Sequence, residues 1–122
     1  MSRINSCIKG KVGEREWAEY LREHNFSDAR RGRQYSGSPE SPDVVGGIPG
    51  THCEVKRTEK INIYKAMEQA IGDAGDKIPY VAHRRNRGEW LIILRADDFM
   101  KILLKKYGLL AYSGESLPGE KP

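Results

Sequence analysis

His52-Cys53-Glu54-Val55-Lys56 is the stretch that decides the fold, because its residues predict a strand with two chemically different faces. Side chains alternate across a strand, so Cys53 and Val55 share an apolar face that can pack into a core. Glu54 and Lys56 share the opposite face, about 6–7 Å apart at two rises of the strand. An acid and a lysine held together in this way predict a functional site on that face.

A second acid is expected beside this strand. Pro42-Asp43 opens a short strand at Val44-Val45, and the turn over 46–50 folds that strand back against 51–57. Asp43 can therefore stand near Glu54. Two carboxylates at such a distance repel, and each pKa rises unless a cation lies between them. Mg²⁺ prefers oxygen ligands and is often held by one or two carboxylates, so the pair predicts a divalent-metal site.

A third acid lies on the helix expected over 9–25. Glu14 stands three residues before Trp17 and seven before Leu21, which places it on the apolar stripe of that helix. An acid that faces the core is costly unless it is paired or near a metal. Two alternatives stay open: Glu14 contributes to the acidic site, or it lies at the exposed edge of the stripe or pairs with a lysine.

The remaining pattern predicts one α/β domain over 1–112, followed by a Gly-, Ser- and Pro-rich tail without order over 113–122. We expect the order α-β-β-β-α-β-β-α, with a central mixed five-stranded β-sheet flanked by α-helices. The predicted strands are 29–33, 44–45, 51–57, 78–83 and 89–94, and the predicted helices are 9–25, 63–75 and 97–107. In the last helix we expect Phe99, Ile102 and Leu103 to be buried.

Three motifs follow one another along the chain: Glu14, then Pro42-Asp43, then Glu54-Val55-Lys56. This order resembles the PD-(D/E)xK nuclease superfamily, whose members share a restriction-endonuclease-like fold. Further features resemble archaeal-type Holliday junction resolvases: Lys9-Gly10-Lys11-Val12-Gly13-Glu14-Arg15, Phe26 with the arginines that follow it, Ser36-Gly37 and Gln69. The arginine-to-serine spacing and the loop before Asp43 depart from the resolvase pattern, which bears on the junction substrate more than on nuclease activity.

The resemblance implies a Mg²⁺-dependent endodeoxyribonuclease that leaves a 5′-phosphate and a 3′-hydroxyl, with Mn²⁺ as a substitute ion and no organic cofactor. The implied metal ligands are Asp43, Glu54, the backbone carbonyl of Val55 and Glu14. Lys56 would orient the attacking water, Gln69 would position Lys56, the water or the phosphate, and Ser36 would donate to a phosphate. One chain has one site and a junction is cut on two strands, so the resemblance also implies a homodimer.

The charge of the chain is compatible with DNA but does not require it. Lys and Arg number 21 against 17 Asp and Glu, a net charge of +4 over 122 residues. The residues that we predict to contact DNA are Lys9, Arg15, Arg30, Arg31, Arg33, Ser36, Arg84, Arg85 and Arg87. The alternative is that the two arginine-rich segments are solvated turns. Apolar residues near Ile92, Phe99, Leu103 and 109–110 could form the dimer interface, but we expect most of them in the core.

Several classes of protein are disfavoured. The longest apolar run in the body, Leu91–Leu94, is too short to span a bilayer, and the first residues lack a signal sequence. Cys7 and Cys53 form no C-x-x-C pair, which favours a reducing cytoplasm. A short stand-alone resolvase would also suit phage or prophage recombination in a bacterial host. The remaining alternatives are a VRR-type or nicking nuclease of the same fold and a DNA-binding module without catalysis. A small-molecule enzyme ranks last because no Gly-rich nucleotide loop is present.

Overall fold

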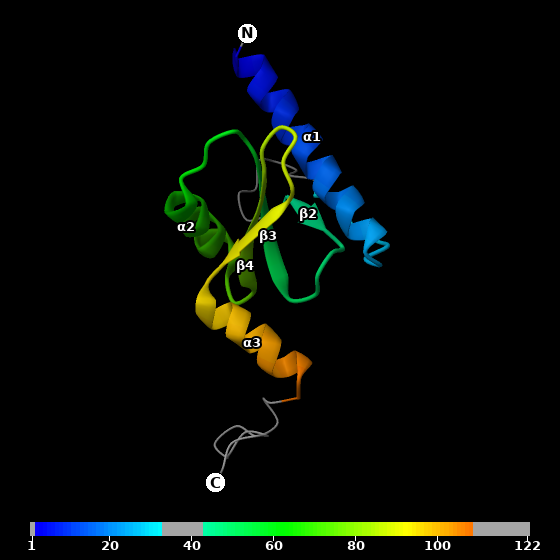
Figure 1. Ribbon diagram of the computed structural model, residues 1–122, viewed down its shortest axis with the longest axis vertical. Coiled ribbons are helices and arrows are strands. Elements are labelled where there is room, and N and C mark those ends of the chain that lie inside the picture. Colours follow the sequence, from blue (N-terminus) through cyan, green and yellow to red (C-terminus); the bar gives the residue numbers. More distant parts are fainter. Residues whose placement is uncertain (1, 33–42, 109–122) are drawn as a thin grey trace.

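The computed structural model describes the backbone of residues 2–32 and 43–108, and the side chains of 10–32 and 43–108 (Figure 1). Several predictions therefore lie outside the described residues. These concern Arg33, Ser36, the loop before Asp43, 109–110, the tail 113–122 and the side chain of Lys9.

The described residues form three helices and five strands in the predicted order α-β-β-β-α-β-β-α. The elements are α1 (Ser2–Glu23), β1 (Arg30–Arg31), β2 (Val44–Val45), β3 (Thr51–Arg57), α2 (Ile63–Ala74), β4 (Ile78–Arg84), β5 (Leu91–Leu94) and α3 (Ala96–Lys106). This confirms the type and order of the predicted elements, with α1 beginning earlier than expected. None of the described helices is long and apolar enough to cross a membrane.

The predicted five-stranded sheet is wrong, because the strands form two sheets. β3 pairs in parallel with β4, β4 pairs antiparallel with β5, and β1 and β2 form a separate antiparallel pair. At the junction of the two sheets, the backbone N–H of Asp43 donates to the Cys53 carbonyl at 3.0 Å. The N–H of Val55 on β3 donates to the Asp43 side chain at 2.8 Å. Asp43 therefore joins the two sheets through both its backbone and its side chain.

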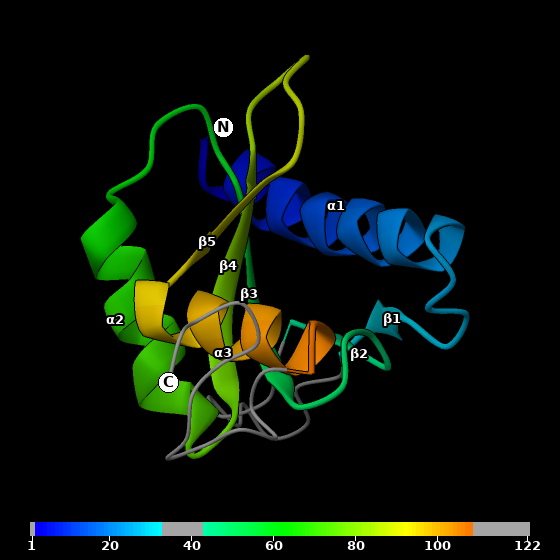
Figure 2. The ribbon, with the colours of Figure 1, turned by 60° about the horizontal axis from the view of Figure 1, so that its bottom comes forward.

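The three-stranded sheet lies between α1 and α2 (Figure 2). On one face Trp17 and Leu21 of α1 share a core cluster with Cys53 and Val55, which confirms the predicted apolar face of β3. On the other face α2 buries Ala66, Met67 and Ala70 against Val81 of β4. Because α2 covers the second face, Glu54 is enclosed between β3 and α2 instead of facing open solvent.

The core predicted for α3 and β5 is also wrong in part. The exposed fraction is 45% for Phe99, 40% for Ile102 and 44% for Ile92, whereas Leu103 is half-buried. The first turn of α3 buries Asp98, which accepts a hydrogen bond from Arg95 at 2.9 Å. The inward side of that turn is thus occupied by an ion pair, so the neighbouring Phe99 lies on the exposed side.

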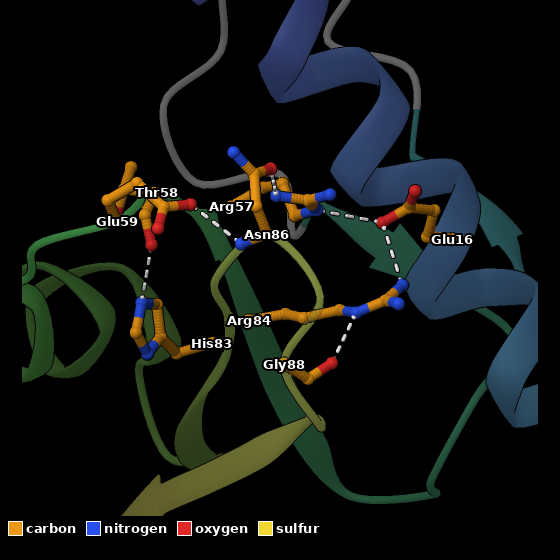
Figure 3. Close-up of polar contacts among 8 residues, drawn as sticks. All are labelled: Glu16, Arg57, Thr58, Glu59, His83, Arg84, Asn86 and Gly88. Atoms are coloured by element: carbon orange, nitrogen blue, oxygen red, sulfur yellow. Dashed lines mark hydrogen bonds and ion pairs between the residues drawn. The ribbon is translucent and has the colours of Figure 1, made fainter.

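A polar network fixes α1 against the end of β3 and the β4–β5 connection (Figure 3). Glu16 accepts from Arg57 of β3 at 3.0 Å and from Arg84 of β4 at 3.3 Å. Arg57 also donates to Asn86 at 2.8 Å, and the Asn86 N–H donates to Glu59 at 2.6 Å. These contacts tie α1, the end of β3 and the β4–β5 connection together, which sets the position of Glu14 two residues before Glu16.

Candidate active site

Two buried carboxylates form the centre of the site. Asp43 precedes β2 and is 8% exposed, and Glu54 on β3 is 7% exposed. Burial is the main cause that raises the pKa of Asp43 to about 6. The hydrogen bond from the Val55 N–H lowers this pKa, and the charge of Glu14 raises it further. Burial and the nearby Asp43 raise the pKa of Glu54 to about 7. The two acids therefore repel each other in a poorly hydrated space, which is the electrostatic condition that a bound cation relieves.

Lys56 and Gln69 lie beside the acids on the α2 side of β3. The Lys56 Nζ donates to the Gln69 Oε1 at 3.1 Å, which links β3 to α2. Lys56 lowers the pKa of both Asp43 and Glu54, although its effect is smaller than that of burial. The amide of Gln69 thus holds a lysine close to the buried carboxylates.

Glu14 is half-buried on α1, and its partner is an arginine rather than a lysine. The Arg31 Nε donates to the Glu14 Oε1 at 2.8 Å, so the pair joins α1 to β1. Beyond the larger effect of burial, the charge of Glu14 raises the pKa of Asp43 and, more weakly, that of Glu54. Close packing makes this approach feasible, because a Cβ added at Gly13 would stand 2.6 Å from the Arg57 Cβ.

One group among the described residues brings three candidate ligands close enough to hold a metal ion. The ligand atoms of His52, Glu54 and Asp73 all lie within 4.8 Å of one another, and neither Glu14 nor Asp43 belongs to this group. Burial lowers the pKa of His52, and the negative charge of Asp73 partly offsets this effect. A carboxylate-rich pocket with raised acid pKa values fits a divalent cation.

The sequence reasoning missed His52 and Asp73. The signal for His52 is its position two residues before Glu54, on the same face of the strand. The signal for Asp73 is its position four residues after Gln69, on the same side of α2. Neither spacing alone predicts a metal site, because His52 lies on β3 and Asp73 on α2, and only the packing of α2 on β3 brings them together.

Basic residues gather in two hollows on the surface. A groove of about 600 Å³ is lined by Arg15, Ala18, Arg22, Arg30, Arg31 and Val45. A smaller hollow of about 210 Å³ beside Lys56 includes Lys60 and Lys65. The first groove brings together three of the predicted DNA contacts. Arg22, Lys60 and Lys65 were not predicted, and their signal is proximity in the fold rather than clustering in the sequence.

The second arginine-rich segment lies elsewhere. Arg84 donates to the Gly88 carbonyl at 2.8 Å as well as to Glu16 (Figure 3), and Arg85 and Arg87 are exposed. The groove that contains Arg84, of about 650 Å³, is lined by Glu16, Glu19, Tyr20, Glu23, Arg84, Gly88, Glu89 and Trp90. Its four acids oppose phosphate binding there, so the arginine groove is the better surface for DNA.

Comparison with known proteins supplies the family. A family model described as archaeal Holliday junction resolvase (Hjc) matches residues 5–107. No curated protein and no solved structure matches the chain significantly. The matched region includes Glu14, Asp43, the stretch from Glu54 to Lys56, and Gln69. The chain therefore belongs to the archaeal Holliday junction resolvase family, within the PD-(D/E)xK nuclease superfamily.

Proposed function

We propose that this protein is a metal-dependent endonuclease that hydrolyses phosphodiester bonds in four-way DNA junctions. The observation that carries the proposal is the buried pair Asp43 and Glu54 beside Lys56, in a chain of the archaeal resolvase family. Buried acids with raised pKa values are costly to the fold, and such cost is typical of functional sites.

The donor set of the site fits Mg²⁺, with Mn²⁺ as a substitute. Asp43, Glu54 and the Val55 carbonyl would hold the ion, and Glu14 would contribute directly or through water. All four donors are oxygens, which is the preference of these cations. When bound, the ion neutralises charge at the scissile phosphate and lowers the pKa of a bound water.

The protein side chains perform the remaining steps. Lys56 orients the attacking water and stabilises the negative charge that develops on it. Gln69 keeps the Lys56 ammonium in place through its hydrogen bond. Ser36 donates to a backbone phosphate. The products are a 5′-phosphate and a 3′-hydroxyl.

DNA is held by contacts to its backbone. The arginine groove of Arg15, Arg22, Arg30 and Arg31 supplies phosphate contacts on one side of the site. The exposed Arg85 and Arg87 are further candidate contacts. Lys9, Arg33 and Arg84 are retained as candidates from the sequence alone. Phosphate contacts supply affinity and orientation without reading bases, which suits an enzyme selective for DNA shape. We also expect the protein to act in the cytoplasm.

A homodimer places two such sites on one junction. Several large apolar side chains of β5, α3 and the C-cap of α3 are exposed among the described residues and can form the interface: Leu91, Ile92, Phe99, Met100, Ile102 and Tyr107. A two-fold interface uses the same patch on both subunits, which matches the symmetry of paired cuts on opposed strands.

The experiment is a comparison of DNA substrates. Purified protein with Mg²⁺ is incubated with a four-way junction, a flap and a linear duplex of the same sequence, and initial rates are measured. We expect the junction to be cut much faster than the other two, by paired nicks on opposed strands. Equal rates on all three would overturn the junction assignment but leave nuclease activity standing.

A further inference from the structure

His52, Glu54 and Asp73 form a three-residue cluster between β3 and α2 that the proposed nuclease chemistry does not use as a unit. His52 and Glu54 are two residues apart on β3, so both side chains lie on the face that α2 covers. Their ligand atoms and that of Asp73 all lie within 4.8 Å of one another. His52 is 3% exposed, Glu54 is 7% exposed and Asp73 is half-buried, so the cluster is an enclosed site rather than a group of surface charges.

The imidazole of His52 supplies an independent observation. Its Nε2 atom is buried and has no hydrogen-bond partner among the described residues. Buried polar atoms in native proteins are nearly always satisfied, and an unsatisfied atom calls for an explanation such as an ion. A neutral imidazole nitrogen can donate its lone pair to a metal ion, and the two neighbouring carboxylates can bind the same ion.

We propose that His52, Glu54 and Asp73 bind a divalent transition metal, of the class of Mn²⁺, Co²⁺ and Zn²⁺, at a position adjoining the Mg²⁺ site and sharing Glu54 with it. The chemistry of the donors sets the class, because imidazole suits transition metals whereas Mg²⁺ prefers oxygen alone. The site extends the proposed nuclease, but metal binding at it does not depend on DNA cleavage.

The test uses the full chain without DNA, loaded with Mn²⁺ alone. Pulsed electron paramagnetic resonance detects a nitrogen bound directly to Mn²⁺. The Mg²⁺ site offers oxygen donors only, so a nitrogen signal reports the His52 site. We expect the signal in the wild type and in His24→Gln, which alters an exposed histidine on the opposite side of the sheet. We expect its loss in His52→Gln.

A second pair of variants covers the case in which His52→Gln does not fold. Asp73→Asn removes a half-buried ligand, and Asp76→Asn alters an exposed acid three residues later as a control. Loss of even an outer partner of a metal ligand weakens binding by about 10–100-fold. We therefore expect Asp73→Asn to raise the Mn²⁺ concentration that half-saturates the nitrogen signal by at least about tenfold. Asp76→Asn should bind as the wild type does.

Asp43→Asn separates this inference from the proposed function. That variant should lose DNA cleavage but keep the nitrogen signal, because Asp43 is not in the cluster. A wild type that cuts junctions but shows no bound nitrogen would overturn the transition-metal site alone. A nitrogen signal that half-saturates at the wild-type Mn²⁺ concentration in Asp73→Asn would also overturn it.

Discussion

Asp43 has two structural roles, and they explain why this residue is both buried and charged. Its carboxylate accepts the Val55 N–H at 2.8 Å, which ties the residue that precedes β2 to β3. The same bond holds the carboxylate in a buried position, and burial raises its pKa, with a further increase from the charge of Glu14. One carboxylate thus connects the two sheets and takes part in the acidic site.

The raised pKa values predict a pH-dependent instability in the metal-free protein. Asp43 and Glu54 ionise near pH 6 and 7 in the folded chain, against about 4 in the unfolded chain. Because the folded state retains these protons longer, the free energy of unfolding falls as the pH rises from about 4 to 7. Asp43→Asn removes one of the two buried charges that lower the free energy of unfolding at high pH. At pH 8 in EDTA the variant should therefore be more stable than the wild type by about 1–3 kcal/mol.

Thermal denaturation followed by circular dichroism measures this difference. At pH 4 the variant and the wild type should melt at nearly the same temperature, because Asp43 is protonated in the folded protein. Mg²⁺ at pH 8 should raise the melting temperature of the wild type more than that of Asp43→Asn. A variant less stable than the wild type at pH 8 would show that the ionised Asp43 stabilises the fold.

At the scale of elements, the contact between α1 and β3 decides whether Glu14 reaches the site. A Cβ at Gly13 would stand 2.6 Å from the Arg57 Cβ, whereas a Cβ at Gly10 meets nothing within 4 Å. We expect Gly13→Ala to cost about 1–3 kcal/mol through overpacking. Gly10→Ala should stabilise the same helix by about 1 kcal/mol, since alanine is the better helix former.

Chemical denaturation of the two variants tests this contact, and cleavage rates show whether α1 has moved. Gly13→Ala should also cut DNA more slowly, because Glu14 is the next residue. Equal stability of the two variants would mean that α1 does not approach β3 as closely as the structure has it.

The sequence predicted the elements better than their pairing. Alternation along 51–57 is a local property, so the two faces of β3 were predictable from Cys53, Glu54, Val55 and Lys56. The split into two sheets was not, because the pairing of strands depends on contacts between segments far apart in the sequence. His52 and Asp73 were missed for a related reason: the α2 crossover brings them together, and no local pattern encodes that contact.

At the scale of the whole molecule, charge and apolar surface are distributed unevenly. The net charge of +4 hides an arginine groove beside β1 and an acidic groove beside the β4–β5 connection. The helical period of α3 predicted an apolar side but could not say what covers it. Phe99 and Ile102 proved exposed among the described residues, which is the condition for a subunit interface.

That surface predicts a homodimer. We expect the wild type to sediment at twice the mass of one chain and Phe99→Asp to sediment as a monomer, because a buried charge without a partner opposes association. Tyr64→Asp is the matched control, since Tyr64 on α2 is an aromatic residue with 82% exposure outside this surface. The monomeric variant should make single nicks in a junction. A dimer that persists in Phe99→Asp would place the interface elsewhere.

Cleavage of a labelled four-way junction by Asp43→Asn, measured beside its binding, tests the central claim most directly. The wild type with Mg²⁺ should cut the junction. The variant should cut at least about 10²–10³-fold more slowly, as expected for loss of a preorganised electrostatic group. It should bind the junction as tightly as the wild type or more tightly, because a negative charge near the phosphates is gone. Unchanged cleavage by Asp43→Asn would contradict the account.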